Sequence, residues 1–391
     1  MRVMLANLSK MVGDAGGLAK VTSSFANEMI ARGHSIGIVH SDEEKNDFFY
    51  TTDCQVQLYN VRNINGHILK YPAFYKIERE FARLFSKKKA REVNETFEKK
   101  YLVNNLKNII KNFEPDVIVS FQLSTSKLLL FDLNVKIPII TMIHGHPGDI
   151  FFDYPDLDVK ALAKSDICQV LLPSFKSVII EKIPQANIVV IGNVVPQNIE
   201  SSNLEKEKKV YKIIQVGRLG KNVKRQHLLI EAFAKVSAKH PNWIIEFWGA
   251  EGKRAYTNFL NVLIKKYGLE KKVFFRGTTS NVFSVLSEGD IFAFPSAFEG
   301  FGLALAEAMS VGLPVIGYRS CSAVNELILD GENGFLCADG ISDLADKLDM
   351  LMSDKNLRIR FGKNGKISMQ QYEPKLIWDK WESLLKDVSE K

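Results

Sequence analysis

The chain has 391 residues, 46% hydrophobic and 25% charged, which is long enough for two or more domains with separate cores. This composition excludes an intrinsically disordered chain, and no stretch approaches the ~20 continuous apolar residues that a membrane-spanning helix needs. Four scattered cysteines without a C-x-x-C pair argue against a disulfide scaffold or a zinc site, and the net charge of +7 is unevenly distributed.

The first half begins without a signal-peptide pattern, which predicts a cytosolic protein. An apolar strand over 2–8, a glycine-rich turn and a helix over 18–32 come first. Gly33 ends that helix, and a strand over 35–40 follows at once. Further strands with helical stretches between them are expected at 56–61, 116–121, 138–144, 166–173 and 188–190.

Positive charge gathers between Lys70 and Asn112, where twelve Lys or Arg residues face five Glu residues. Aromatic and leucine side chains at helical spacing precede the run Lys87–Lys89, a pattern typical of a helix that lies on an anionic lipid surface. A solvated helix face is the simpler interpretation and stays open. Nucleic acid ranks last, because no binding motif accompanies the charge.

A polar segment over 201–209 predicts a linker, after which strands and helices alternate more regularly. Strands are expected at 212–216, 243–248, 273–276, 291–295 and 314–318. Helices are expected at 226–240, 255–267, 282–287, 302–310 and 324–329, where the regular part ends. An amphipathic helix over 371–391 closes the chain.

This alternation predicts an α/β fold with two doubly wound domains, residues 1–195 and 196–370. The last helix, 371–391, is expected to pack back towards the first domain. Because such sheets bind ligands outside the carboxyl ends of their strands, a cleft between the domains is the expected site.

Two segments of the second half carry the clearest chemistry. The loop Glu299–Gly302 follows a strand and opens a helix that carries Glu307, so backbone amides and two carboxylates line one wall. Arg218 and Lys224 follow the first strand of the same domain and could hold a diphosphate. Together these groups suit a nucleotide sugar, although an exposed helix Glu and a solvated basic turn would leave the same pattern.

Two segments of the first half give weaker signals. Gly16 and Gly17 at the head of the first helix offer an anion cradle, but they do not match G-x-G-x-x-G. His144 and His146 stand in a glycine-rich loop after a strand, which favours a functional role over zinc binding, since the other histidines are isolated. The D-x-D triplet at Asp156–Asp158 is a weak metal-site candidate.

These motifs resemble the family-4 retaining glycosyltransferases of the GT-B fold, of the type that builds bacterial polysaccharides and lipid-linked glycans. The resemblance is carried by FANEMIARGHSIGIV, VGRLGKNVKRQHLLIEAF, FAFPSAFEGFGLALAEAMSVGLPVIGY and NELILDGENGFL. It covers most of the chain and is strongest from Lys212 to Leu336. One departure stands out: the common Lys-Gly after the Gly-Arg turn is Lys224–Arg225 here.

The resemblance implies transfer of a hexose or N-acetylhexosamine from a nucleotide diphosphate sugar, with uridine the commonest base, to a glycan acceptor in surface polysaccharide synthesis such as lipopolysaccharide or capsule. It implies retention of configuration, no metal and no cofactor. The implied catalytic residues are His144, Arg218, Lys224 and Glu299. The implied donor-binding residues are Gly16, Gly17, Arg218, Lys224, Arg276, Glu299, Gly300, Phe301, Gly302, Leu303 and Glu307.

A lipid-linked acceptor on the inner face of the cytoplasmic membrane fits the basic segment 70–112, while a soluble sugar or protein acceptor stays open. The alternatives are a GT-B epimerase or phosphorylase, a nicotinamide oxidoreductase and a non-catalytic binding subunit. A phosphorylase is disfavoured by chain length and the oxidoreductase by the missing fingerprint. A binding subunit would be expected to have lost one of the four charged residues Arg218, Lys224, Glu299 and Glu307, all of which are present.

Overall fold

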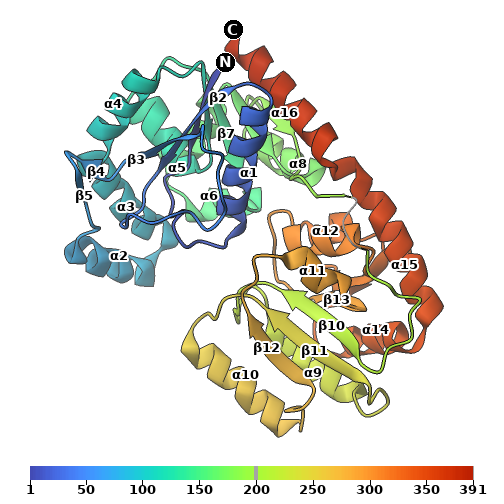
Figure 1. Cartoon of the computed structure of the whole chain (residues 1–391). Helices are drawn as coiled ribbons and strands as arrows, with labels where there is room; N and C mark the ends of the chain where they lie inside the picture. The colour runs from blue at the N-terminus through green and yellow to red at the C-terminus, as the bar shows by residue number, and fades with distance from the viewer. Residues whose placement is uncertain (198–200, 391) are drawn as a thin grey trace. The chain divides into compact units, whose positions relative to one another are not determined.

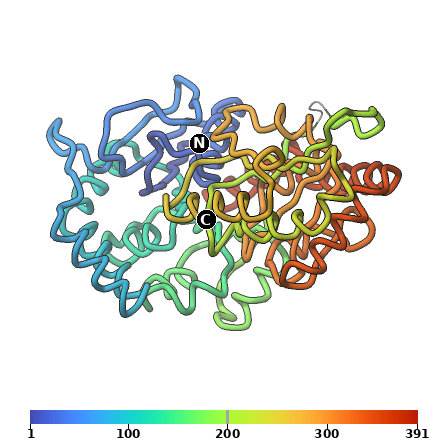
Figure 2. The backbone as a smooth tube through the Cα atoms, turned by 90° about the horizontal axis from the view of Figure 1, so that it is seen from below, coloured from blue at the N-terminus to red at the C-terminus, as the bar shows by residue number. Residues whose placement is uncertain are grey.

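The computed structural model describes residues 1–197 and 201–390, which form two compact units (Figure 1). The first unit comprises Met1–Gly192 and the C-terminal residues from Trp378 onwards, and the second comprises Asn193–Ile377. The chain therefore passes from the first unit into the second and returns, as the colour gradient of Figure 2 traces.

The first unit is built on a parallel sheet in the order β3-β2-β1-β6-β7-β8-β9. Most of its strands are short runs of buried β-branched and other apolar residues, as a sheet covered on both faces requires. The order reverses between β1 and β6. The strands are β1 (Arg2–Ala6), β2 (Ser35–His40), β3 (Gln57–Asn60), β6 (Val117–Ser120), β7 (Ile139–Ile143), β8 (Ile167–Val170) and β9 (Ile188–Val190).

Helices flank this sheet, and a small antiparallel hairpin lies apart from it (Figure 1). The region 70–112 forms most of three consecutive helices. The helices are α1 (Gly17–Ala31), α2 (Ala73–Phe85), α3 (Lys87–Tyr101), α4 (Val103–Phe113), α5 (Leu123–Lys127), η1 (Leu128–Asp132), η2 (Pro147–Asp149), α6 (Ile150–Asp153), α7 (Asp156–Lys164) and α8 (Pro173–Lys182), and the hairpin is β4 (Asn63–Ile64) with β5 (His67–Ile68).

The last helix, α16 (Pro374–Ser389), packs its C-terminal part on α1. Trp378 and Trp381 meet the ring of Phe25 edge-on at 5.5 and 4.9 Å between centroids. Arg32, which follows α1, forms ion pairs of 2.8 Å with Asp379 and with Glu382. The expected helix 371–391 thus begins three residues later, and Lys391 lies outside the described residues.

The second unit contains a parallel sheet in the order β12-β11-β10-β13-β14-β15, which reverses between β10 and β13. Its strands are β10 (Tyr211–Val216), β11 (Trp243–Trp248), β12 (Val273–Gly277), β13 (Ile291–Phe294), β14 (Val315–Tyr318) and β15 (Gly334–Cys337). Its helices are α9 (Gln226–Val236), α10 (Arg254–Lys266), α11 (Val282–Ser287), α12 (Leu303–Ser310), α13 (Val324–Leu327), α14 (Ser342–Ser353), α15 (Lys355–Ser368) and η3 (Met369–Tyr372).

The expectation that regular structure stops near Leu329 is wrong, because β15, α14 and α15 follow. The buried stripe of α15 includes Arg358, Gly362 and Gly365, so its apolar periodicity is too weak to see in the sequence. At Gly362 a β-carbon would lie 2.1 Å from the carbonyl oxygen of Gly312. Glycine therefore serves here to bring two backbones together.

Candidate functional site

The loops after β10 and β13 leave the second sheet where its strand order reverses, the place at which doubly wound sheets bind ligands. The backbone amide of Ala297 donates to the carbonyl of Val223 at 2.8 Å, which joins the two loops. At Gly249, after β11, a β-carbon would lie 2.4 Å from the carbonyl oxygen of Gly217. The loops after β10, β11 and β13 are thus in direct backbone contact.

Lys224 and Glu299 meet at this reversal. The Lys224 ammonium lies 2.5 Å from a carboxylate oxygen of Glu299 and 4.6 Å from the centroid of the Phe294 ring. Their side chains are 20% and 14% exposed, so water reaches the pair only in part. The site therefore holds a cation and a carboxylate side by side, each available to a polar ligand.

Arg225 fastens the loop that carries Glu299. Its guanidinium donates to the carbonyls of Pro295 and Ser296, both at 2.8 Å, and lies 4.6 Å from the centroid of the Tyr318 ring. Its backbone is left-handed, with φ 48° and ψ 43°, a conformation that favours glycine. Arginine in place of the common glycine therefore strains the backbone at this position, but its side chain ties the loop that carries Glu299 to its own.

The N-terminus of α12 follows directly. Gly302 occupies its cap position with φ 78°, and having no side chain it offers no acceptor to the first amides of the helix. Phe301 is buried with its ring edge-on to Tyr372 at 5.0 Å, which holds the preceding turn. Leu303 begins the helix, and Glu307 is buried one turn further on. Amides that lack a side-chain cap and carry the positive end of the helix dipole suit an anion.

The two remaining predicted cations of this unit differ in their surroundings. Arg218 is exposed, and among residues 1–197 and 201–390 no carboxylate pairs with its guanidinium. Arg276 forms an ion pair of 2.8 Å with the buried carboxylate of Glu246, which neutralises much of its charge. Arg218 is therefore the better placed of the two to meet an added anion.

In the first unit, the loop between β1 and α1 is tied down by carboxylates. Buried Asp42 accepts hydrogen bonds from the amides of Met11 and Val12 and contacts His40 Nδ1 at 2.7 Å, and these contacts hold the pKa of Asp42 below its usual value despite its burial. Asp14 accepts a hydrogen bond from the amide of Gly16 at 2.9 Å. The predicted anion cradle at Gly16 and Gly17 thus has a carboxylate of its own chain beside it.

His144 follows β7 and stacks on Phe121 with 5.6 Å between ring centroids. Burial lowers its pKa to about 4, so its imidazole is neutral at physiological pH. Its Nε2 atom is buried without a hydrogen-bond partner among the described residues. A buried polar atom of this kind is ready to bind a ligand group. His146 instead accepts a hydrogen bond from the amide of Gly148 and begins a short helical turn.

The D-x-D triplet does not form one site. Exposed Asp156 pairs with Lys88 at 2.6 Å, whereas Asp158 is fully buried. In the part of the chain that the structure describes, no three His, Cys, Asp or Glu side chains are grouped as metal ligands.

The sequence profile of the glycosyl transferases group 1 matches residues 194–368, nearly the whole second unit. The second unit therefore matches the glycosyl transferases group 1, and the chain has the GT-B fold. It is 23% identical over 384 residues to an uncharacterized glycosyltransferase of Haemophilus influenzae, covering 96% of this chain and 97% of that one. It is 27% identical over 267 residues to the N-acetyl-alpha-D-glucosaminyl L-malate synthase of Bacillus anthracis, covering 65% and 68%.

Among solved structures, this chain is similar to a TarM variant of Staphylococcus aureus in complex with fondaparinux, alpha-GlcNAc-glycerol and UDP. The TM-score is 0.77 at 17% identity, covering 98% of this chain and 100% of the other. The predicted GT-B fold of the chain is thereby confirmed.

Three features of the glycosyltransferase could not be found by motif. The Lys224–Glu299 pair joins residues 75 positions apart, and the tether from Arg225 spans 70 positions to Pro295. Asp42 was overlooked because a single Asp after a strand has no distinguishing pattern. Of these features, the tether alone gave a signal in the sequence, because Arg225 stands where the family pattern commonly has glycine.

Proposed function

We propose that this glycosyltransferase moves a hexose or N-acetylhexosamine from a UDP-sugar to a glycan acceptor with retention of configuration, in the synthesis of a bacterial surface polysaccharide. The observation that carries the proposal is the grouping of Lys224 and Glu299 with the N-terminus of α12 at the reversal between β10 and β13. The complex of the similar TarM structure with UDP supports a uridine donor.

Each part of the donor has a matching group in the second unit. Arg218, Lys224 and the first amides of α12 would bind the diphosphate, because cations and a helix N-terminus both favour phosphate. Glu307 would accept hydrogen bonds from the ribose hydroxyls. Glu299 and the backbone of Gly300 and Phe301 would hold the sugar.

The Lys224–Glu299 contact gives the donor site a resting arrangement. In it the ammonium neutralises the carboxylate, so neither charge is left uncompensated in a half-buried place. When a diphosphate arrives, Lys224 gains a second anion, and Glu299 is freer to accept hydrogen bonds from sugar hydroxyls. The pair would thereby couple phosphate binding to sugar recognition.

The proposed reaction is a front-side displacement. The bond between the sugar C1 and the diphosphate oxygen breaks, the acceptor oxygen bonds to C1 on the same face, and the acceptor proton passes to the departing diphosphate. Arg218, Lys224 and the α12 amides would stabilise the charge that develops on the leaving group. These protein groups supply the stabilisation without a metal ion.

The resemblance also assigns Gly16, Gly17 and His144 to the donor. Since burial keeps His144 neutral, it would act there as a hydrogen-bonding partner of the sugar and not as a cation. Arg276 is a weaker proposal for the base, because Glu246 already binds it.

The test measures thermal midpoints of the full chain with UDP, several UDP-sugars and other nucleoside diphosphates. A ligand at 100 times its Kd adds about 2.7 kcal/mol of stability. We expect a shift with UDP and with one UDP-sugar. A shift with another nucleotide only would correct the base, and no shift with any of them would refute donor binding.

Turnover of the donor identified in this way tests the mechanism. Arg218→Ala and Lys224→Ala should each lower kcat by about 10²–10³. Lys221→Ala is the matched control, since Lys221 is an exposed cation of the same loop that lies 5.3 Å from the Phe259 ring. NMR of the products would show a retained linkage, while an inverted linkage would overturn the mechanism and an epimerised nucleotide sugar would favour the epimerase.

A further inference from the structure

Helix α2 exposes a row of large apolar side chains to solvent. None of its residues is buried, and five of them are between 63% and 80% exposed. We call these five the α2 apolar face: Phe74, Ile77, Phe81, Leu84 and Phe85. Single exposed apolar residues are common on protein surfaces, but a contiguous group on one helix marks an interaction site.

The spacing puts this face on one side of α2 and away from the rest of the unit. Steps of three, four, three and one residues keep all five within about 100° of the helix circumference. The side that packs inward is a different stripe that includes Tyr75 and Ala82. The Tyr75 ring meets Phe97 of α3 at 5.5 Å. The α2 apolar face is therefore left largely to solvent.

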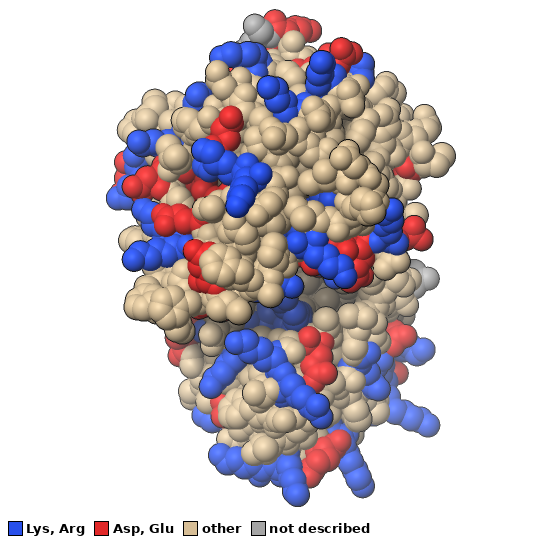
Figure 3. Space-filling model, turned by 90° about the vertical axis from the view of Figure 1, so that its left-hand side faces the viewer, with Lys and Arg blue, Asp and Glu red and all other residues tan. Residues whose placement is uncertain are grey.

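The basic border of the α2 apolar face is the start of α3, where Lys87, Lys88 and Lys89 follow Phe85 closely. The basic residues of α2 itself lie on the other side of the helix, and Glu80 pairs with Arg79 at 2.9 Å and with Arg83 at 2.7 Å. Figure 3 shows Lys and Arg side chains beside uncharged surface on this side of the molecule, with Asp and Glu among them.

The three lysines at the start of α3 are not equivalent. Lys87 pairs with Asp153 at 2.8 Å and Lys88 with Asp156 at 2.6 Å. Within the described ranges 1–197 and 201–390, Lys89 pairs with no carboxylate. Its charge is thus available to an external anion.

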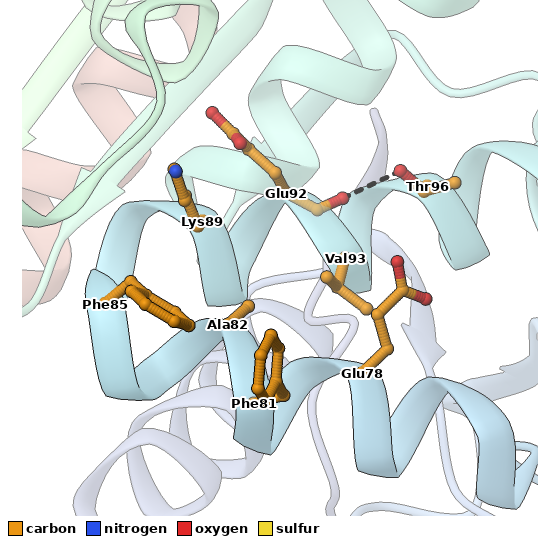
Figure 4. A pocket seen from close by; sticks show the side chains of 8 residues that line it. All are labelled: Glu78, Phe81, Ala82, Phe85, Lys89, Glu92, Val93 and Thr96. Carbon is orange, nitrogen blue, oxygen red and sulfur yellow. Dashed lines mark hydrogen bonds between the residues drawn. The ribbon is translucent and has the colours of Figure 1, made fainter.

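An open groove of about 510 Å³ runs between α2 and α3, next to the apolar face (Figure 4). Phe81 and Phe85 form its α2 side, while Lys89 and Val93 belong to its α3 side. Glu78 and Glu92 also line the groove, so its rim carries charges of both signs around apolar walls. An apolar groove with a polar rim suits the boundary between lipid chains and headgroups.

A further exposed aromatic residue lies on α6, which is linked to the start of α3 by an ion pair. Phe152 of α6 is 83% exposed, and its neighbour Asp153 is the partner of Lys87. An exposed aromatic side chain thus also lies on α6, the helix whose Asp153 pairs with the basic border.

We propose that the α2 apolar face docks this enzyme on an anionic lipid bilayer, with the aromatic and leucine side chains among the headgroups and the basic residues against lipid phosphates. This goes beyond the proposed function and does not depend on it. Among the described residues no helix is long and apolar enough to cross a membrane, so the contact is interfacial. Each apolar side chain that becomes fully buried strengthens binding by roughly tenfold or more, and each basic residue by about fivefold.

Charge favours a lipid over a second copy of the chain. A twofold contact through this face would bring the basic border of one copy, Lys87, Lys88 and Lys89, towards the same residues of the other. Like charges at an interface weaken association. An anionic bilayer instead matches both the apolar face and its basic border.

The experiment is flotation of the full chain with vesicles of phosphatidylcholine, alone or mixed with phosphatidylglycerol. We expect binding to the mixed vesicles that weakens as salt rises, because the basic border acts by screened charge. Phe81→Glu with Leu84→Glu should lower the bound fraction more than tenfold. Val262→Glu is the matched control, since Val262 of α10 is 64% exposed, and it should bind as the unaltered chain does.

Insertion can be measured separately. Phe85→Trp should show blue-shifted emission when mixed vesicles are added, and Val262→Trp should not. Thermal midpoints and the shift caused by UDP should be the same in the glutamate variants as in the unaltered chain, because α2 buries no side chain and carries none of the residues proposed to bind the donor.

No binding to either vesicle would overturn the proposal, as would equal loss of binding in Val262→Glu. If light scattering shows a dimer that only Phe81→Glu with Leu84→Glu dissociates, and vesicles do not bind, a second copy covers the face instead. Failure of the UDP shift with intact vesicle binding would count against the proposed function alone.

Discussion

Arg225→Gly tests how the loop that carries Glu299 is held in place, because two physical effects predict opposite changes in the free energy of unfolding. Glycine would relieve the left-handed backbone at φ 48°, a gain of about 1–2 kcal/mol. It would also remove the two hydrogen bonds that the charged guanidinium donates, worth about 1.5–3 kcal/mol each. The buried carbonyls of Pro295 and Ser296 would then lack this donor. The ring contact with Tyr318 adds about 0.5–1 kcal/mol.

The tether outweighs the strain, so Arg225→Gly should lower the free energy of unfolding by about 2.5–5 kcal/mol. For a unit of this size the midpoint of thermal unfolding should then fall by roughly 5–20 °C. Calorimetry of the full chain measures it. The KM for the donor should also rise in this variant, because the loop that carries Glu299 loses its hydrogen bonds to Arg225.

The matched control is Glu114→Gly, at another left-handed position, φ 47°, where α4 ends. Glu114 is exposed and makes only a 3.5 Å surface ion pair with Arg2. Glycine there should leave stability unchanged or raise it by up to about 1 kcal/mol. If Arg225→Gly behaves like Glu114→Gly, the tether contributes nothing and the reasoning fails.

Three further substitutions test the first unit. Burial and the neighbouring carboxyl of Glu95 raise the pKa of Asp158 from its usual value to about 8. Its contribution to stability is therefore present below the usual pKa and is lost as pH rises through 8, so Asp158→Asn should flatten the fall in urea midpoint between about pH 4 and 8. The pKa of His144 is lowered to about 4, so stability is lost as pH falls from about 6.5 to 4, and His144→Gln should reduce that loss without altering the pH–rate profile above pH 5. Asp14→Asn removes a carboxylate beside Gly16 and should lower the Kd for UDP about fivefold by calorimetry; an unchanged Kd would remove Gly16 from the donor site.

The strands of both sheets could largely be predicted from the sequence, because parallel strands buried on both faces appear as short apolar runs between turns. The ranges 35–40, 188–190 and 243–248 agree to the residue. Element ends differ by a few residues elsewhere, as with the expected helix 226–240, which ends at Val236. Periodicity failed at α15, where glycines and a buried arginine form the packing stripe.

The candidate site was predictable only as separate pieces. A cation after one strand and a carboxylate after another can be seen in the sequence, but their contact depends on β10 and β13 being neighbours. Counting charged residues along the sequence is limited in the same way, because it does not show which acidic residues from elsewhere in the chain lie near the basic ones. The excess over 70–112 is partly neutralised by Asp153 and Asp156, which lie far along the chain. The exposure of the α2 apolar face depends in the same way on which stripe of α2 packs against α3.

The two glycine-rich turns of this enzyme illustrate why local sequence cannot rank anion sites. Both precede a helix with a bare glycine at its cap, Gly16 before α1 and Gly302 before α12. At Gly16 the chain supplies its own carboxylate, Asp14, so an incoming phosphate meets a like charge. Near Gly302 the carboxylate of Glu299 is already neutralised by Lys224. Since both helix N-termini carry the positive end of a helix dipole, the charge of nearby side chains distinguishes them, and it favours an anion at α12 over one at α1.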